Sequence, residues 1–498
     1  MYVMSRDGCK MIDKKAIEIV GIPSIVLMEN AANEVFSKIK DLGQSFTVIC
    51  GTGNNGGDGL AIGRKLVLAK REVHFVIISP RENYSNDFNV NYNIIDNMNC
   101  KISFIKDISD IHNLKEIINF NEIIIDSIFG IGINKELNEF YKEVIKVIND
   151  SKKYIIAVDV PSGLDCNTGN PMGGAVKAST TYTFEVVKLG FINYNSFKYL
   201  GNLEVIPIGI PNEIKDIINE GVTILEDYYY RDIIRRREIY GHKGDYGRAI
   251  IFAGSKGFTG AAYLATKACL KTGAGLTALI TPKDIQDILS GMLIESMTSN
   301  FNEEEKVDKL ISTANAIAYG PGLPSSKEYE DFLLYISKNS SCHLVIDAEG
   351  INILSRRPEI LDRLKGRMIL TPHPGEMSRL VGKSISEVES DRINIAKEYA
   401  KKYKSIVLLK GYNTVITDGE KTYINTTGNS KMASGGSGDC LTGMIVSLLA
   451  QKHSPLESAL IGAYVHGKAG EIAGKYKYSV TASDIIDNIS TIIHNIIM

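Results

Sequence analysis

Short runs rich in isoleucine and valine alternate with longer amphipathic segments along most of the chain. In the first half, the apolar runs are residues 45–50, 73–79, 102–105, 123–125, 154–158, 184–187 and 203–206. The segments 59–69 and 138–148 between them have the 3.6-residue periodicity of helices. Buried strands that alternate with helices predict a largely parallel sheet with helices on both faces.

A second series of the same kind fills the other half of the chain. Its apolar runs are residues 249–253, 276–280, 316–319, 344–346, 368–371, 406–410 and 414–417, with helical segments at 261–272 and 441–450. Residues 211–224 between the two series are turn-rich, so we place a domain junction there. Two domains suit 498 residues because single cores stop growing near ~250–300 residues. We therefore expect two α/β domains, at residues 1–215 and 222–498.

Charge and cysteine content limit the partners and the compartment. Lys and Arg total 56 against 58 Asp and Glu, so no basic surface for nucleic acid is expected. The seven cysteines are dispersed without C-x-x-C spacing, which indicates free thiols in a reducing compartment. The first 15 residues are polar, and no apolar run approaches the ~20 residues that span a bilayer. We expect a soluble cytoplasmic protein that binds neither nucleic acid nor membranes.

A glycine-rich loop, G-T-G-N-N-G-G-D-G at residues 51–59, follows the first predicted strand and opens a helix. Glycines let the backbone approach a phosphate, and a helix N-terminus offers unpaired N–H groups. The spacing matches neither the G-x-G-x-x-G of dinucleotide-binding folds nor a Walker loop. An ordinary nicotinamide dehydrogenase is therefore disfavoured.

Two aspartate-containing loops follow later strands. D-S-I-F-G-I-G at 126–132 follows one strand, and D-V-P-S-G-L-D at 159–165 follows another. Either aspartate alone is best explained as a helix cap or a turn former. Three polar loops at consecutive strand ends, however, favour a shared ligand site, because open α/β sheets bind ligands there.

Together these three loops resemble the NAD(P)H-hydrate epimerase family across most of residues 10–211. The resemblance implies a Rossmann-like three-layer α/β/α domain, in which Asp159 is the acid/base at the hydrated carbon. It implies that a potassium ion is held by Asn55, Asp126 and Ser162. It also implies that the hydrated dinucleotide contacts Asn54, Asn55, Gly56, Gly57, Asp58, Gly130, Ile131, Gly132, Ile133, Asn134, Lys135 and Glu136.

In the second half, N-S-K-M-A-S-G-G-S-G-D at 429–439 precedes a predicted helix. Backbone N–H groups of Gly436, Ser437 and Gly438 can face the charge that develops on a phosphoryl group. Asp439 comes next and can deprotonate an attacking hydroxyl. Phosphoryl transfer needs mainly such positioning and electrostatic stabilisation, so we expect a phosphate site here.

This string resembles the ribokinase-like superfamily, and an ordered set of further motifs narrows the resemblance. The motifs are G-H-K-G-D-Y-G at 241–247, A-I-I-F-A-G-S at 249–255, Y-G-P-G-L at 319–323, V-I-D-A at 345–348, L-T-P-H-P-G-E at 370–376 and L-K-G-Y-N-T at 409–414. They resemble the ADP/ATP-dependent NAD(P)H-hydrate dehydratase family over about residues 225–498. One difference is Glu349, where the family usually has aspartate.

The second resemblance implies roles for named residues. Asp439 would be the base. Contacts to the hydrated dinucleotide would come from Ala261, Gly322 and His373. Contacts to the adenine nucleotide would come from Lys410, Gly411, Tyr412, Asn413, Thr414 and Gly438. The implied cofactors are ADP or ATP, with ADP favoured, together with Mg²⁺.

The two resemblances imply a fused repair enzyme for hydrated NADH and NADPH, and a homo-oligomer. The first domain would interconvert the R and S forms, and the second would phosphorylate the S form and release phosphate. One alternative is a ribokinase-like kinase of a small-molecule alcohol, which would leave a stable phosphate ester. Another is a non-catalytic binding module, against which the acid/base Asp159 and the complete 51–59 loop count.

Overall fold

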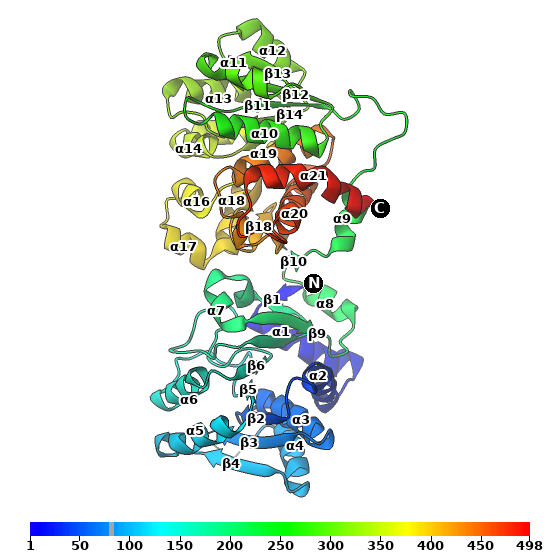
Figure 1. Cartoon of the computed structure of the whole chain (residues 1–498), viewed down its shortest axis with the longest axis vertical. Helices are drawn as coiled ribbons and strands as arrows, with labels where there is room; N and C mark the ends of the chain where they lie inside the picture. The colour runs from blue at the N-terminus through cyan, green and yellow to red at the C-terminus, as the bar shows by residue number, and fades with distance from the viewer. Residues whose placement is uncertain (79–83) are drawn as a thin grey trace. The chain divides into compact units, whose positions relative to one another are not determined.

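The computed structural model describes residues 1–78 and 84–498, which divide into two units, Met1–Val222 and Thr223–Met498. Each unit contains a sheet with covering helices, as Figure 1 shows. The α/β class predicted from the alternating pattern is therefore confirmed.

The first unit is built on a seven-stranded sheet in the order β4-β3-β2-β5-β6-β7-β9. Every neighbouring pair in this sheet is parallel. A separate pair joins β1 to β8. The strands are β1 (Val3–Met4), β2 (Ser45–Cys50), β3 (Glu72–Ile78), β4 (Lys101–Ile105), β5 (Ile123–Ser127), β6 (Tyr154–Val158), β7 (Thr180–Phe184), β8 (Val187–Lys188) and β9 (Asn202–Ile206).

Helices cover both faces of this sheet. One core cluster joins α2, α3 and α4 to the side chains of one face, and a second joins α5 and α6 to the other. This three-layer arrangement follows from strands that are apolar on both sides. The helices are α1 (Arg6–Lys15), α2 (Ser24–Ile39), α3 (Asn54–Leu68), α4 (Asn86–Asn97), α5 (Ile111–Phe120), α6 (Glu139–Asp150), α7 (Phe197–Leu200) and α8 (Asn212–Ile218).

The second unit is built on a sheet in the order β10-β19-β18-β17-β16-β15-β14-β11-β12-β13. The pairs from β17 through β13 are parallel, whereas β17-β18 and β18-β19 are antiparallel. The strands are β10 (Val222–Ile224), β11 (Arg248–Phe252), β12 (Leu276–Thr281), β13 (Met297–Asn300), β14 (Ala316–Tyr319), β15 (His343–Ile346), β16 (Met368–Leu370), β17 (Ile406–Leu409), β18 (Thr414–Thr417) and β19 (Thr422–Asn425).

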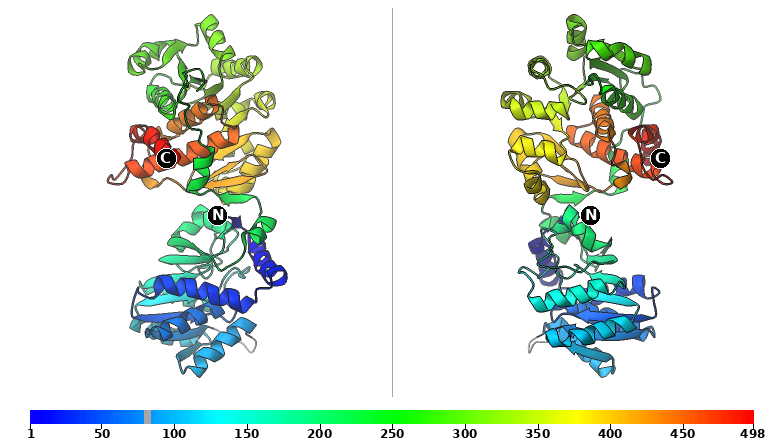
Figure 2. Two further views of the ribbon diagram at one scale, coloured as in Figure 1. Left: turned by 90° about the vertical axis from the view of Figure 1, so that its right-hand side faces the viewer. Right: turned by 60° about the vertical axis from the view of Figure 1, so that its left-hand side comes forward.

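Helices also lie on both faces of the second sheet (Figure 2). A large cluster packs α10, α19, α20 and α21 on one face, and Phe332 of α13 contacts Phe252 on the other. The helices are α9 (Asp227–Ile233), α10 (Thr259–Thr272), α11 (Lys283–Met292), α12 (Glu304–Ser312), α13 (Lys327–Asn339), α14 (Glu349–Arg356), α15 (Pro358–Leu364), α16 (Pro374–Val381), α17 (Ile385–Ser390), α18 (Arg392–Tyr403), α19 (Ser437–Ala450), α20 (Pro455–Ala473) and α21 (Ala482–Ile497).

Three sequence-based boundaries need correction. The strand predicted at 184–187 is wrong, because β7 ends at Phe184 and Glu185 adopts a φ of 62° that breaks the extended chain. The helix predicted from residue 59 begins at Asn54, so residues 54–59 of the glycine-rich loop are helical. The turn-rich stretch 211–224 contains α8 and β10. The last residue of the strand predicted at 73–79 lies outside the described residues.

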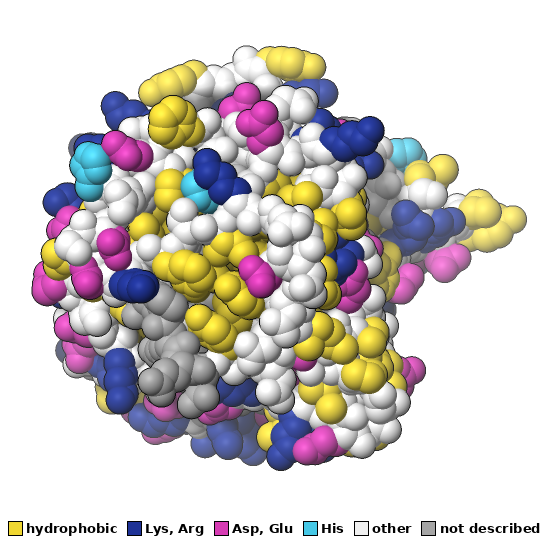
Figure 3. Space-filling view, turned by 90° about the horizontal axis from the view of Figure 1, so that it is seen from below, with side chains coloured by type: hydrophobic (Ala, Val, Ile, Leu, Met, Phe, Trp, Pro, Cys, Tyr) yellow, Lys and Arg dark blue, Asp and Glu magenta, His cyan; other side chains and the backbone are white. Residues whose placement is uncertain are grey.

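No helix in the described part of the chain is long and apolar enough to cross a membrane. On the face drawn in Figure 3, basic and acidic side chains are interspersed around a group of hydrophobic ones. This mixture fits the near-equal counts of acidic and basic residues.

Candidate active sites

Three adjacent strands of the first unit end at the same edge of the sheet. β2, β5 and β6 are neighbours and parallel, so the residues that follow them share this edge. Asn54 follows β2, Asp126 lies within the end of β5, and Asp159 follows β6 directly. The polar loops predicted to share a site therefore do lie at one sheet edge.

Glycines of the 51–59 loop allow the helix to pack close to the sheet. A Cβ added to Gly56 would lie 1.9 Å from the Gly51 carbonyl oxygen, and one on Gly59 would lie 1.9 Å from Ser127 Oγ. Such distances are far below van der Waals contact. Neither glycine can be replaced by a larger residue unless α3 moves.

Asp126 and Ser162 form a buried polar contact beside Asn55. The Ser162 backbone N–H donates to Asp126 Oδ2 over 2.8 Å, and burial raises the pKa of Asp126 to about 6 despite that bond. Both polar atoms of the Asn55 amide are buried without a hydrogen-bond partner among the described residues. An unpartnered buried amide is costly, so a ligand at this position would relieve it.

The 130–136 loop is held at its start by Arg6. The guanidinium donates to the carbonyl oxygens of Ile131 and Ile133 and pairs with Asp165 over 2.6 Å. An added Cβ on Gly130 would lie 3.3 Å from Asn55 Cβ, so this loop meets the glycine-rich loop. Asn134, Lys135 and Glu136 are exposed further along.

Asp159 lies in a buried, charged environment. Its backbone has a φ of 63°, and its Oδ1 lies 2.6 Å from Lys188 Nζ. Burial lowers the pKa of Lys188, but Asp159 and the neighbouring Cys9 and Asp13 raise it more, so the ammonium stays charged. A non-glycine residue at this φ is uncommon and is typical of functional turns.

Other carboxylates surround this ion pair. Burial, together with Asp159 and Asp13, raises the pKa of Asp58 well above its ordinary value. Burial and Asp159 also raise the pKa of Asp13 to about 6. Perturbed carboxyl groups gathered around one buried ion pair are a frequent property of catalytic sites.

In the second unit, a cavity of about 1130 Å³ lies among the loops that follow the parallel strands. Four of the predicted site residues line it, namely Ala261, Gly322, His373 and Asp439. Gly322 has a φ of 64°, and an added Cβ would lie 2.8 Å from the Ala261 Cβ. These two residues therefore form one wall of the cavity.

The start of α19 lies at this cavity. Gly436, with a φ of 88°, precedes the helix, and Asp439 is in its first turn. Burial and the nearby Asp347 raise the pKa of Asp439 to about 7, against the opposite effect of Lys410. Asp439 is therefore poised between its acid and base forms near neutral pH, as a catalytic base should be.

A network of charged groups lies beside Asp439. Lys410 Nζ is 2.8 Å from Asp347 Oδ1 and 3.9 Å from Glu376 Oε2, and Thr442 Oγ1 donates to Asp347 Oδ2 over 2.7 Å. An added Cβ on Gly438 would lie 3.4 Å from Lys410 Nζ. Lys410 therefore brings positive charge to the N-terminus of α19, where an anion is favoured.

His373 has a structural role as well as a place at the cavity. Its ring Nδ1 accepts from the backbone N–H groups of Gly375 and Glu376. In return, the backbone N–H of His373 donates to the Glu376 carboxylate. This capping box begins α16. Burial lowers the pKa of His373, so the imidazole is neutral at pH 7.

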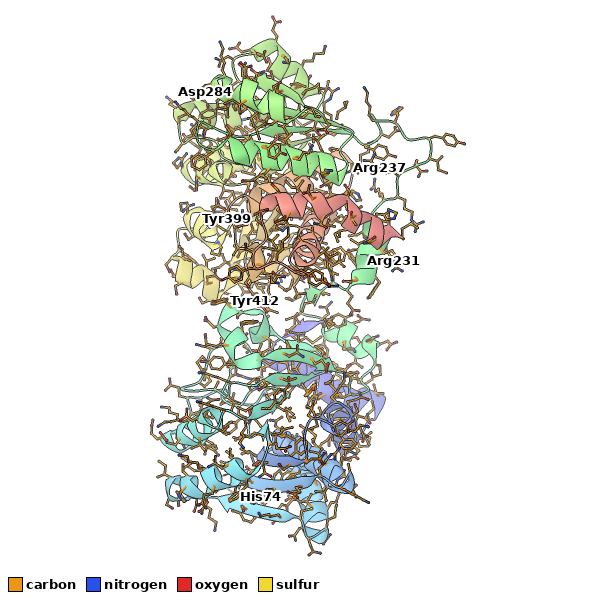
Figure 4. All side chains as sticks on the ribbon, in the orientation of Figure 1. His74, Arg231, Arg237, Asp284, Tyr399 and Tyr412 are labelled. Atoms are coloured by element: carbon orange, nitrogen blue, oxygen red, sulfur yellow. The ribbon has the colours of Figure 1, made fainter. Side chains whose placement is uncertain are left out.

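The remaining predicted residues lie outside the cavity lining. Gly411, Tyr412 and Asn413 lie in the turn between β17 and β18, and Thr414 is the first residue of β18. Figure 4 places Tyr412 well away from Asp284, which lines the cavity. Only Lys410 and Gly438 of the expected nucleotide contacts lie close to Asp439.

Several residues of both sites were not given roles from the sequence. They are Arg6, Asp13 and Lys188 in the first unit and Asp347 and Glu376 in the second. The last two lie within quoted motifs, so those motifs carried a usable signal. Lys188 stands in an apolar stretch, V-V-K-L at 186–189, where a buried lysine already calls for a partner.

Comparisons with known families divide the chain in the same order as its motifs. A family model described as "YjeF-related protein N-terminus" matches residues 24–190. A second, described as "NAD(P)H-hydrate dehydratase", matches residues 249–491.

Full-length relatives and a solved structure are also similar. A bifunctional NAD(P)H-hydrate repair enzyme Nnr of Moorella thermoacetica is 35% identical, with 100% of this chain and 97% of the relative covered. One of the same name from Thermofilum pendens is 34% identical, with 95% and 92% covered. A crystal structure of a ribokinase-like superfamily protein from Enterococcus faecalis matches with a TM-score of 0.52 and 27% identity, over 56% of this chain and 97% of that one. This match confirms the ribokinase-like fold predicted for the second half.

Proposed function

The chain belongs to the bifunctional NAD(P)H-hydrate repair enzymes, and from that membership we propose how its residues carry out the two reactions. The enzyme epimerises the R and S forms of hydrated NADH and NADPH and dehydrates the S form. We assign epimerisation to residues 1–215 and nucleotide-dependent dehydration to residues 222–498.

Asp159 is the acid/base of epimerisation. Inversion at the hydrated carbon requires the hydroxyl to leave as water and water to return on the opposite face. As an acid, Asp159 donates the proton that lets the hydroxyl leave, and as a base it takes a proton from the incoming water. Its place at the edge shared by the first turn of α3, residues 54–58, and the 130–136 loop supports this role. These two segments bind the dinucleotide.

Asn55, Asp126 and Ser162 hold a potassium ion. The unpartnered buried amide of Asn55 and the buried Asp126 carboxylate offer oxygen donors of the type that such an ion prefers. When bound, such an ion would supply positive charge at this edge of the sheet. Asp126 and Ser162 are already joined by a hydrogen bond, so they present their oxygens together.

Asp439 is the base of dehydration, and the observation that carries this proposal is its place at the cavity in the first turn of α19. It takes the proton from the hydroxyl of the S hydrate as that oxygen attacks the terminal phosphoryl group. The N–H groups of residues 436–438 and the Lys410 ammonium stabilise the charge on the phosphoryl oxygens. Elimination of phosphate, with loss of a proton from the adjacent ring carbon, then restores the double bond of the reduced nicotinamide ring.

The nucleotide enters as its Mg²⁺ complex, with ADP favoured over ATP. Ala261, Gly322 and His373 contact the hydrated dinucleotide, and residues 410–414 with Gly438 contact the nucleotide. The cavity volume of about 1130 Å³ leaves room for large ligands. The seven free cysteines suit the reducing cytoplasm we propose for the enzyme. The homo-oligomer implied by the resemblance stays a prediction.

The test is recovery of nicotinamide absorbance from a mixture of R and S hydrates of NADH, with ADP or ATP and Mg²⁺. Asp439→Ala should abolish recovery, and Asp159→Ala should limit it to the S fraction plus slow spontaneous epimerisation. A stable phosphate ester that accumulates without recovery would indicate an alcohol kinase instead. Recovery in Asp439→Ala equal to that of the unmodified chain would rule out the assigned base.

A further inference from the structure

One oxygen of the Asp159 carboxylate is saturated by donors from β7 and β8. Oδ1 lies 2.6 Å from Lys188 Nζ, and it accepts from the Phe184 N–H over 3.1 Å and from Thr183 Oγ1 over 3.3 Å. In the part of the chain that the structure describes, Oδ2 receives no hydrogen bond from protein. The two oxygens are therefore unequal, and only Oδ2 is available to a ligand.

Lys188 is itself held in one position. Its side chain is 3% exposed, and its ammonium donates to the carbonyl oxygens of Phe184 and Val186 over 2.9 and 3.5 Å. Its backbone pairs with Met4 in the short parallel pair β1-β8. With three acceptors and a paired backbone, this lysine has no freedom to turn away from Asp159.

The turn that carries Lys188 is anchored from a second side. Glu185, at a φ of 62°, accepts from the Ile208 N–H over 2.8 Å and pairs with Lys215 over 2.6 Å. A strained residue persists only where its surroundings hold it. The strain here orients the segment that delivers Lys188 and the Phe184 N–H to Asp159.

We propose that Lys188 is a positioning residue of the epimerase reaction, which orients the Asp159 carboxylate through Oδ1 so that Oδ2 exchanges the proton. This inference rests on the acid/base role proposed for Asp159. The charged and titratable groups around the pair are Cys9 and Asp13 of α1, Asp58 of α3, Cys166 of the loop after β6, and Glu185. Most of these groups are acidic, so Lys188 supplies the opposing charge.

The experiment uses the full chain without nucleotide, so that only epimerisation proceeds. Conversion of pure S hydrate of NADH to the R and S mixture is followed by chromatography from pH 5 to 9. Lys188→Met should lower kcat by about 100-fold or more, the range expected for lost acid/base catalysis. The pH dependence of the rate should move to higher pH by about one unit or more, because loss of a cation beside a carboxyl favours the protonated carboxyl. Lys188→Arg should restore much of the rate and the original pH dependence.

Lys65→Met is the matched control, since Lys65 pairs with Glu29 in the same unit, away from Asp159. It should keep both kcat and the pH profile. If thermal unfolding shows that Lys188→Met is not folded, Lys188→Gln is tested in its place. Its amide keeps a hydrogen-bond donor but carries no charge. An unchanged rate, or a loss equal at every pH, would overturn the inference. Full activity in Asp159→Asn would instead overturn the acid/base assignment, and the two failures are thereby distinguished.

Discussion

Lys410 Nζ lies 2.8 Å from Asp347 Oδ1, although the two residues follow strands β17 and β15, which β16 separates in the sheet. The pair therefore passes across the end of β16. Thr442 of α19 donates to the other oxygen of Asp347, so the helix that carries Asp439 is tied to the same network. A single aspartate thus links the end of β15, Lys410 after β17 and the first turns of α19.

Because the two sites lie in different units, their activities should be separable by single substitutions. Asp159→Asn should lower the rate of R-to-S conversion by about 100-fold or more and leave dehydration of pure S hydrate unchanged. Asp439→Asn should do the reverse. Both rates are measured on the full chain with each pure epimer, and loss of both activities in one variant would contradict independent sites.

The dehydratase rate should depend on pH through Asp439. The reaction needs the ionised carboxylate, and the pKa of that group is raised to about 7, so kcat should rise up to and then level off above pH 7. Glu376→Gln removes a negative charge that raises this pKa. The acidic limb of the pH–rate profile, where kcat rises with pH, should therefore move to lower pH by up to about one unit. Glu359→Gln, in an exposed ion pair elsewhere, should leave the limb in place. If the acidic limb stays near pH 7 in both Asp439→Glu and Glu376→Gln, Asp439 is not the group that controls the rate.

The same pKa predicts a cost in stability at alkaline pH. The folded-state pKa of about 7 exceeds the unfolded value of ~3.9, so the folded state binds the proton more tightly between these limits. This contribution is present in full below pH ~3.9 and is lost as the pH rises from there through 7. Asp439→Asn should therefore raise the unfolding free energy at pH 8 by about 1–3 kcal/mol and by clearly less at pH 5. Thermal unfolding at pH 5 and pH 8 measures the difference, and equal changes at both pH values would refute the buried carboxylate as its cause.

The glycine-rich loop offers a matched pair of substitutions. Gly56→Ala places a methyl group 1.9 Å from the Gly51 carbonyl oxygen, so it should destabilise the first unit by about 1–3 kcal/mol and lower epimerase activity. Gly53→Ala, at a negative φ with nothing within 4 Å, should be tolerated. Denaturant unfolding of the full chain compares them, and similar losses would mean that the whole loop, rather than one contact, is intolerant.

Removal of potassium should slow epimerisation selectively. Asn55→Ala takes away an amide whose buried polar atoms have no protein partner in the described chain, so it should raise the K⁺ concentration needed for half-maximal rate. Asn134→Ala, at an exposed position of the 130–136 loop, should leave the K⁺ requirement unchanged. The titration replaces K⁺ with a bulky organic cation at constant ionic strength. A rate independent of K⁺ in the unmodified chain would remove the basis for this ion site.

Much of the architecture was predictable because its signals are local. Runs such as Ser45–Cys50, Tyr154–Val158 and Ala316–Tyr319 are apolar stretches bounded by turn residues, and the structure has strands at those limits. Because the polar motifs directly follow predicted strands in the sequence, they could also be placed at the strand ends. Predictions failed where a backbone conformation rather than composition decides, as at Glu185, whose φ of 62° divides one expected strand into two.

Residue types and their order by themselves determined two α/β domains and the loops that carry chemistry, since strand periodicity and turn composition are properties of neighbouring residues. Only the tertiary structure decided which charges meet. Lys188 pairs with Asp159 although 29 positions separate them in the sequence. Asp347 contacts both Lys410 and Thr442, and these three residues lie in three separate segments. Burial and long-range Coulomb interactions, which no local pattern encodes, set the pKa of Asp439 near 7 and determine which oxygen of Asp159 remains available.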